Sequence, residues 1–229
     1  MGSKHLSCFD PNIFWIPSEA SPDQNDVFGH FGGVTRLHET AIKILDAAQK
    51  LFNTRGLRKT TVEDIARDAG IGKGTIYNYF EDKEAIFLAS KRAECAVLMQ
   101  KFRKAIRGEQ SACKQLVRFV KSWHQEISAY HQKYPMSSDV FTEFGEVKEY
   151  AVIMHEFHHD QKVFLTGIME TGFDTGEFQI QDIDMACWTV LVALNGLSMS
   201  HLLQEFEVTQ SEKAEVIGNT LVAAFSKAA

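Results

Sequence analysis

Residues 61–84 read TVEDIARDAGIGKGTIYNYFEDKE, and the residue types along them indicate two short helices joined by a turn. Thr61 and the preceding Thr60 can cap a short helix, and Glu63 or Asp64 stands where a capping box needs a carboxylate. The run Gly70–Gly72 predicts a tight turn, because glycine adopts left-handed backbone angles without a steric penalty. A second short helix is expected to follow directly. The stretch therefore predicts a helix-turn-helix.

The second short helix has one apolar side and one polar side. Ile76 and Phe80 lie one turn apart and are expected to face inward. The remaining side chains then fall on the flanks and the outer face: Lys73, Thr75, Tyr77, Asn78 and Tyr79. Lysine, threonine and asparagine can reach base edges, while tyrosine hydroxyls and the ammonium group of Lys83 can hold phosphates. The outer face has the chemistry of a DNA-reading surface.

The composition is that of a globular, helical protein. The chain has 229 residues, of which 45% are hydrophobic and 24% charged. Apolar residues recur at helical spacing and few segments alternate, so we expect an all-α fold. The four cysteines are scattered without a CxxC pair, which favours reduced thiols. Neither a transmembrane run nor a signal-peptide pattern is evident, and we expect a cytoplasmic protein without membrane contact.

The charge is distributed unevenly along the chain. The formal net charge is −6, but residues 36–107 carry a net +6, against −3 for residues 1–35 and −9 for residues 108–229. A basic segment that contains a helix-turn-helix, joined to an acidic remainder, is the pattern expected of a DNA-binding domain attached to a domain that must not adhere to DNA.

The pattern predicts three segments: a poorly ordered arm over residues 1–34, a helix-turn-helix domain over 35–82, and an effector-binding and dimerisation domain over 83–229. The leading helix should span 36–54 and end at Gly56. A long helix should begin at Glu81 or Asp82 and end near Gly108, and it is expected to link the two domains. Its predicted buried side includes Ile86, Leu88, Val97 and Phe102.

Four or five further helices are expected after residue 110. Residues 112–130 form one, residues 139–171 form one bent helix or two, and residues 182–206 form the most apolar one. A last helix should follow the capping box that begins at Thr209. Because the final two helices have wide apolar faces, we expect them to pair with those of a second copy in a four-helix bundle, which makes the protein a homodimer.

One segment of the chain resembles a known family. Residues 40–87 read TAIKILDAAQKLFNTRGLRKTTVEDIARDAGIGKGTIYNYFEDKEAIF and resemble the N-terminal domain of the TetR/AcrR family of transcriptional regulators. The resemblance covers about a fifth of the chain. It implies that the second helix of the motif lies in the major groove of double-stranded operator DNA, with Lys73, Thr75 and Asn78 facing bases. The implied backbone contacts come from Thr61, Tyr77, Tyr79 and Lys83, with Arg67 at the groove edge.

The helical remainder is rich in aromatic residues and methionine, which can line a cavity for an apolar or aromatic small-molecule effector. The candidate effector-binding residues are Trp123, His124, Phe144, Met154, His158, Phe164, Trp188, Leu191 and Asn195. Most aromatic residues in a helical domain of this size belong to its core, so each of these also has a purely structural interpretation. No cofactor is expected.

Residues 155–159 match the HExxH pattern of zinc metallopeptidases, in which two histidines bind the metal and the glutamate acts as general base. No third ligand is identifiable by spacing, and no catalytic residue is assigned. A regulator that senses metal through His155 and His159 remains an alternative. The interpretation that the sequence favours is a dimeric repressor released from a palindromic operator by a small-molecule effector.

Overall fold

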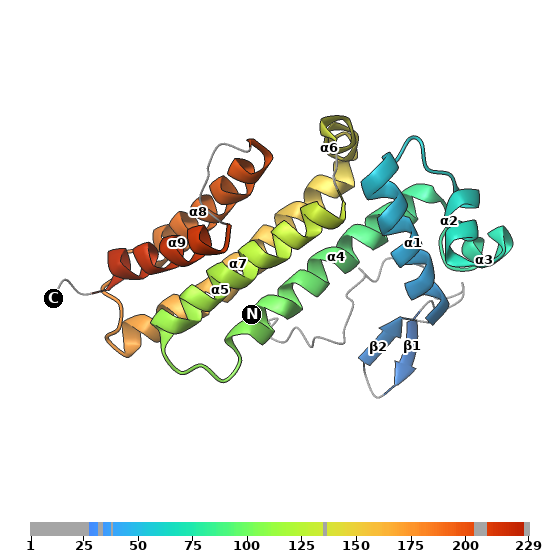
Figure 1. Ribbon diagram of the computed structural model, residues 1–229. Helices are drawn as coiled ribbons and strands as arrows, with labels where there is room; N and C mark the ends of the chain where they lie inside the picture. Colours follow the sequence, from blue (N-terminus) through green and yellow to red (C-terminus); the bar gives the residue numbers. More distant parts are fainter. Residues whose placement is uncertain (1–27, 32–33, 38, 135–136, 204–209, 227–229) are drawn as a thin grey trace. The chain divides into compact units, whose positions relative to one another are not determined.

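The computed structural model describes the backbone of residues 28–31, 34–37, 39–134, 137–203 and 210–226. Side chains are described over 39–134, 137–196 and 212–226. In these ranges the fold is helical, as predicted, apart from one short β-hairpin (Figure 1). Strand β1 (Phe28–Phe31) pairs antiparallel with β2 (Val34–Leu37), and Phe28 lies opposite Leu37.

The hairpin changes the predicted start of the leading helix. Helix α1 spans Glu39–Arg55, and Arg36, which the helical pattern included, belongs to β2. Pairing with Gly29 gives Arg36 an extended backbone that a helix excludes. Most of the predicted N-terminal arm, residues 1–27 and 32–33, lies outside the described residues.

Two compact units make up the chain. Unit 1 comprises Met1–Ala96 and Met136–Tyr150, and unit 2 comprises Val97–Pro135 and Ala151–Ala229. Helix α4 (Lys83–Ile106) and helix α7 (Lys148–Asp174) each contribute residues to both units. The units are divisions by packing, and the functional division after residue 82 stays a prediction.

Unit 1 is built around a three-helix helix-turn-helix, as the sequence predicts. Helices α1, α2 (Val62–Ala69) and α3 (Lys73–Tyr77) pack with the first half of α4 and with α6 (Ser138–Gly145). The core is aromatic at its centre: the ring of Phe87 lies 5.5 Å from that of Phe52 and 4.9 Å from that of Phe144, measured between centroids. Aliphatic side chains surround these rings, among them Ile44, Ile65, Ile76 and Ile86.

Two glycines follow the ends of α1 and of α2, the first helix of the motif. Gly56 follows α1 with φ +86°, and Gly70 follows α2 with φ +68°. Both angles lie in the left-handed region, which an L side chain adopts only with strain. After Gly70, the amide of Ile71 donates to the carbonyl of Ala66 at 3.0 Å and closes the end of α2. The predicted glycine turn is confirmed.

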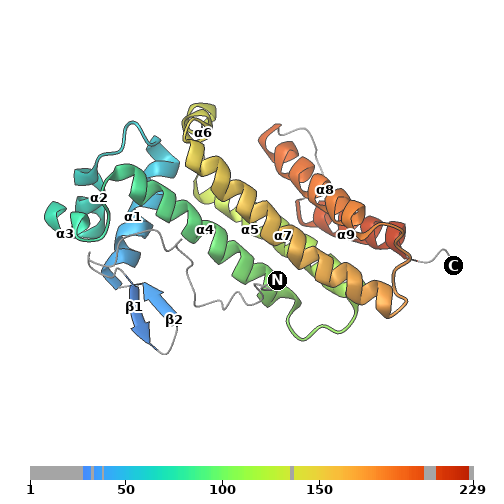
Figure 2. The same cartoon turned by 180° about the vertical axis from the view of Figure 1, so that it is seen from behind.

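Unit 2 contains the later parts of α4 and α7 together with α5 (Ala112–Lys133), α8 (Ile183–Leu203) and α9 (Gln210–Phe225). Helix α5 and most of α7 run side by side (Figure 2). Phe119 of α5 joins them to α4, because its ring centroid lies 5.4 Å from that of Phe102 and 5.5 Å from that of Phe164. The predicted segment 139–171 is two helices, α6 and α7, rather than one.

The buried side of α4 differs from the predicted stripe. Ile86 and Phe102 are buried as expected, but Val97 is 50% exposed, and Phe87 and Lys91 are buried although the stripe did not include them. The reason is that α4 packs against different partners along its length, α1 and α6 in unit 1 and α5 in unit 2. A single helical stripe describes only one such environment.

A carboxylate from the turn after α7 caps the N-terminus of α5. Glu177 accepts hydrogen bonds from the Ser111 hydroxyl at 2.6 Å and from the amides of Ala112 and Cys113 at 3.0 and 3.1 Å. These amides have no partner within the helix, and the helix dipole favours negative charge there. The hydrogen bond from Ser111 and those from the two amides lower the pKa of Glu177 to about 2.

We expect Glu177→Gln to lower the free energy of unfolding at pH 7 by about 1 kcal/mol, because the neutral amide accepts these bonds less strongly. The folded-state pKa lies below the ordinary value of 4.5, so this stability is present above about pH 4.5 and is lost as the pH falls toward 2. Urea unfolding of wild type and variant should therefore converge at low pH. Glu170→Gln, at an exposed position on α7, is the control, and an equal effect of both substitutions would contradict the assignment.

Candidate nucleic-acid interface

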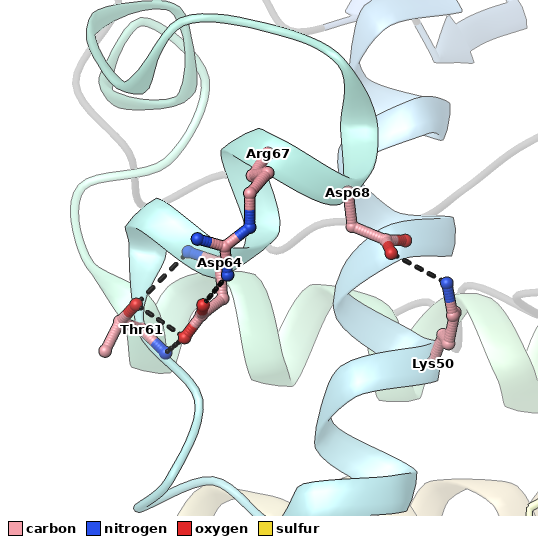
Figure 3. Close-up of polar contacts among 5 residues, drawn as sticks. All are labelled: Lys50, Thr61, Asp64, Arg67 and Asp68. Atoms are coloured by element: carbon pink, nitrogen blue, oxygen red, sulfur yellow. Dashed lines mark hydrogen bonds and ion pairs between the residues drawn. The ribbon is translucent and has the colours of Figure 1, made fainter.

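A capping box fixes the first turn of α2. The Thr61 hydroxyl accepts a hydrogen bond from the amide of Asp64 at 3.1 Å, and the Asp64 carboxylate accepts one from the amide of Thr61 at 3.2 Å (Figure 3). Two amides that the helix leaves without partners are satisfied by this exchange. The capping box predicted from the sequence is confirmed, with Asp64 as its carboxylate.

The remainder of α2 is held by ion pairs at its surface. The guanidinium group of Arg67 pairs with Asp64, and the ammonium group of Lys50 on α1 lies 2.7 Å from the carboxylate of Asp68 (Figure 3). Arg67 itself is exposed, and its side chain stays close to the capping box. The Lys50–Asp68 pair joins α1 to α2 beside their shared apolar core.

Helix α3 has the two-sided character that the sequence predicts. Ile76 is fully buried in the core of unit 1, whereas Tyr77 is 48% exposed. After Tyr77 the chain continues as a turn, in which the amide of Asn78 donates to the carbonyl of Thr75 at 3.2 Å. Tyr79 is half-buried and packs against the core, so less of its ring is available for DNA than the sequence pattern suggests.

All eight predicted DNA-contact residues lie in unit 1, on α2, on α3 and the turn after it, and at the start of α4. Those with exposed side chains are Thr61, Arg67, Lys73, Tyr77 and Asn78, and those with half-buried side chains are Thr75, Tyr79 and Lys83. Their contact with DNA stays a prediction. The structure supports it by placing the five exposed residues at the N-cap of α2, on the two helices of the motif, α2 and α3, and in the turn that follows α3.

Lys73 contacts side chains on both helices of the motif. Its ammonium group pairs with the carboxylate of Glu63 on α2 and lies 5.8 Å from the centroid of the Tyr77 ring. The hydrogen bond between Lys73 and Glu63 raises the pKa of the lysine and lowers that of the glutamate. The sequence pattern indicates Glu63 only as a candidate for the capping box and does not predict its pairing with Lys73, because ten residues and a turn separate the two.

Lys83, at the start of α4, binds the segment between α1 and α2. Its ammonium group donates to the carbonyl of Leu57 at 2.7 Å and to that of Thr60 at 3.0 Å. Two of the three donors of this lysine therefore hold the segment between α1 and α2, which leaves one for the predicted phosphate contact.

Lys91 lies in the core of unit 1. Only 3% of the residue is exposed, and its ammonium group donates to the side-chain carbonyl of Asn53 on α1 and lies 3.0 Å from the carboxylate of Glu94. The same ammonium group stands 4.5 Å from the centroid of the Phe144 ring. Burial lowers the pKa of Lys91, and the nearby Glu94 carboxylate opposes that shift. No sequence pattern marked this lysine as part of the core.

The predicted effector-binding residues are distributed over both units. Phe144 belongs to the core of unit 1, where its ring contacts that of Phe87, whereas the other eight lie in unit 2. Of those eight, Trp123, His124 and Leu191 are buried, Met154, His158 and Phe164 are half-buried, and Trp188 and Asn195 are exposed. Burial lowers the pKa of His158. The position of Phe144 among core rings assigns it to packing within unit 1.

The histidines of the HExxH pattern are exposed on α7. Among the described residues, no group of three histidine, cysteine, aspartate or glutamate side chains could hold a metal ion. Within the part of the chain that the structure describes, His155 and His159 therefore have no third ligand of the kind that the metallopeptidase and the metal-sensing interpretations need. Neither alternative is supported.

Comparison with known proteins agrees with the geometry of unit 1. Residues 44–90 match the family model described as bacterial regulatory proteins, tetR family. The HTH-type transcriptional repressor KstR2 of Rhodococcus jostii is 31% identical over 169 residues, which cover 72% of this chain and 76% of that protein.

Solved structures show the same fold. The fatty acid degradation regulator FadR from Bacillus halodurans superimposes with a TM-score of 0.68 at 21% identity, covering 82% of this chain and 96% of that one. The regulator FadR from Bacillus subtilis in complex with stearoyl-CoA gives a TM-score of 0.64 at 18% identity, covering 80% of this chain and 98% of that one.

Among the helices that the structure describes, none combines the length and the apolar character that a membrane-spanning helix needs.

We expect Lys91→Met to lower the free energy of unfolding by about 3 kcal/mol, because it removes the ammonium group that pairs with the largely buried Glu94 carboxylate. The double variant Lys91→Met, Glu94→Leu should recover most of this loss, since apolar side chains of similar size replace a buried ion pair at little cost. Urea unfolding measures both. Lys43→Met removes an exposed lysine of α1 as control and should change stability by less than about 0.5 kcal/mol. A double variant no more stable than Lys91→Met would contradict the ion-pair account.

Proposed function

The chain belongs to the tetR family of bacterial regulatory proteins and is a DNA-binding transcriptional regulator rather than an enzyme, and from this premise we propose that it represses transcription from a palindromic operator. The observation that carries the proposal is the exposed surface of α2 and α3, held in place by the capping box and the buried Ile76. The relative from Rhodococcus jostii is named a repressor, which supports this direction of control. A repressor of this kind acts in the cytoplasm, where the DNA is.

In this proposal α3 enters the major groove. Lys73, Thr75 and Asn78 contact base edges, which carry the sequence information. The backbone contacts come from Thr61, Tyr77, Tyr79 and Lys83, with Arg67 at the groove edge. Half of Tyr77 is already exposed in the free protein, and a phenolic hydroxyl on such a ring can donate to a phosphate oxygen without rearrangement of the core.

A palindromic operator requires two copies of α3, and the proposed dimer forms through α8 and α9. Met185, Trp188 and Val192 recur at helical spacing on α8 and are exposed, and Val216 is exposed on α9. Large apolar side chains in such a row mark a surface that another chain covers. Two copies of this helix pair would form a four-helix bundle. The two α3 helices must then lie about 34 Å apart, or a multiple of that, to enter successive major grooves.

The proposed effector is an apolar or aromatic small molecule that binds in unit 2. The buried and half-buried candidates Trp123, Leu191 and Phe164 come from α5, α8 and α7, and a similar fold from Bacillus subtilis holds stearoyl-CoA, which has a long apolar chain. Helix α4 has residues in both units, so an effector that displaces its second half changes the position of its first half. This alters the spacing of the two α3 helices and releases the operator.

Lys73→Ala and Tyr77→Ala should each weaken binding to a duplex that the wild-type chain has selected from a random library, by about tenfold, because each removes a contact to DNA. Both side chains are exposed, so the thermal unfolding temperature should change little. Fluorescence anisotropy of the labelled duplex measures the affinity. Lys43→Ala, which removes an exposed lysine of α1, is the control. Unchanged affinity in both variants would contradict the proposed surface.

Val192→Glu should convert the dimer to a monomer, because the proposed bundle would bury the added charge without a partner. Val192 is 64% exposed in one chain, so the monomer should keep its helical content. Sedimentation equilibrium gives the mass of each species, and the monomer should bind the selected duplex more weakly than the dimer. Val152→Glu adds the same charge at an exposed position of α7 and should remain dimeric. A dimeric Val192→Glu variant would place the interface elsewhere.

A further inference from the structure

Three side chains from two helices meet at the proposed DNA-binding surface. The carboxylate of Glu63 on α2 pairs with the ammonium group of Lys73 on α3, and that ammonium group lies 5.8 Å from the ring centroid of Tyr77. The side chain of Glu63 is 57% exposed and that of Lys73 is 48% exposed. We call Glu63, Lys73 and Tyr77 the surface triad.

The stability of the fold gives no reason for the Glu63–Lys73 pair. An ion pair with both partners in water contributes little to folding. Next to DNA, moreover, a carboxylate is unfavourable, because the phosphate backbone repels it. Glu63 lies in the first turn of α2, one residue before the aspartate of the capping box, within residues 36–107, which carry a net charge of +6. An acidic side chain at this position lowers general affinity for nucleic acid.

The pair does restrict where Lys73 can reach. A free lysine side chain contacts whichever phosphate is nearest, and phosphate contacts carry no sequence information. The Lys73 ammonium group has a carboxylate on α2 and an aromatic face on α3 as neighbours, and both attract it. Holding a flexible side chain in one position before binding reduces the entropy lost on binding. The remaining N–H donors can then meet the acceptor atoms of a guanine edge.

We propose that Glu63 is a specificity-determining residue: it keeps Lys73 away from phosphates and directs it to a base edge. Glu63 thereby lowers the affinity for DNA of any sequence and raises the ratio of operator affinity to non-specific affinity. This inference rests on the operator binding proposed above.

The experiment compares Glu63→Gln with Glu81→Gln in the full-length chain. Each substitution removes one exposed negative charge from unit 1, but only Glu63 pairs with Lys73. The probes are the duplex selected by the wild-type chain and a scrambled duplex of equal composition, each titrated over a series of salt concentrations. Glu63→Gln should bind the scrambled duplex about tenfold more tightly, with a salt slope steeper by about one, because Lys73 becomes available to a phosphate. The ratio of the two affinities should fall about tenfold, whereas Glu81→Gln should leave it unchanged.

A double-variant cycle tests whether Glu63 acts through Lys73. In a Lys73→Met background, Glu63→Gln should have no further effect on the affinity ratio. The inference is overturned by an unchanged ratio in Glu63→Gln, by an equal fall in Glu81→Gln, or by a full fall in the Lys73→Met background. A wild-type chain that selects no sequence at all would contradict the operator proposal itself, and with it this inference, before any variant is made.

Discussion

Two lysines of α4 hold the segment that leads into the helix-turn-helix, and the position of the proposed DNA-binding surface depends on them. Lys83 donates to the carbonyls of Leu57 and Thr60, and Lys91 donates to the side chain of Asn53. Their acceptors span the end of α1 and the approach to α2. The α4 helix therefore contacts this segment through directed hydrogen bonds as well as through the apolar contacts of Phe87. Directed bonds fix one register, which apolar packing alone specifies less strictly.

This attachment gives α4 its proposed role in regulation. The helix carries both lysines in unit 1 and continues into unit 2, where Phe102 packs against Phe119. A displacement of α4 would carry its bonded acceptors with it, and with them the start of α2. The capping box, the left-handed Gly70 and the buried Ile76 define the backbone of the exposed surface that follows. In the proposed switch, this surface keeps its own backbone conformation while α4 changes position between the bound and released states.

The sequence predicted the parts of the structure that local chemistry decides. Thr61, Gly70 and Ile76 have roles that follow from capping, from backbone angles and from helical spacing, and the structure agrees with each. It could not predict contacts between distant residues. The sequence does not predict that the charged Lys91 lies in the core, because its acceptor on Asn53 lies 38 residues away in the chain. The sequence pattern around Phe144 predicts an effector contact, because the pattern of α6 does not reveal that its ring packs against Phe87 in unit 1.

The central claim is that residues 61–83 form the surface that reads DNA and that the rest of the chain positions it. Amide hydrogen exchange of the full-length protein, with and without the duplex it selects, tests this claim most directly. The claim predicts slower exchange on binding at the first turn of α2, in α3 and in the turn after it, with the exposed face of α7 unchanged. Protection concentrated in the helices of unit 2, with α2 and α3 exchanging as in the free protein, would contradict it.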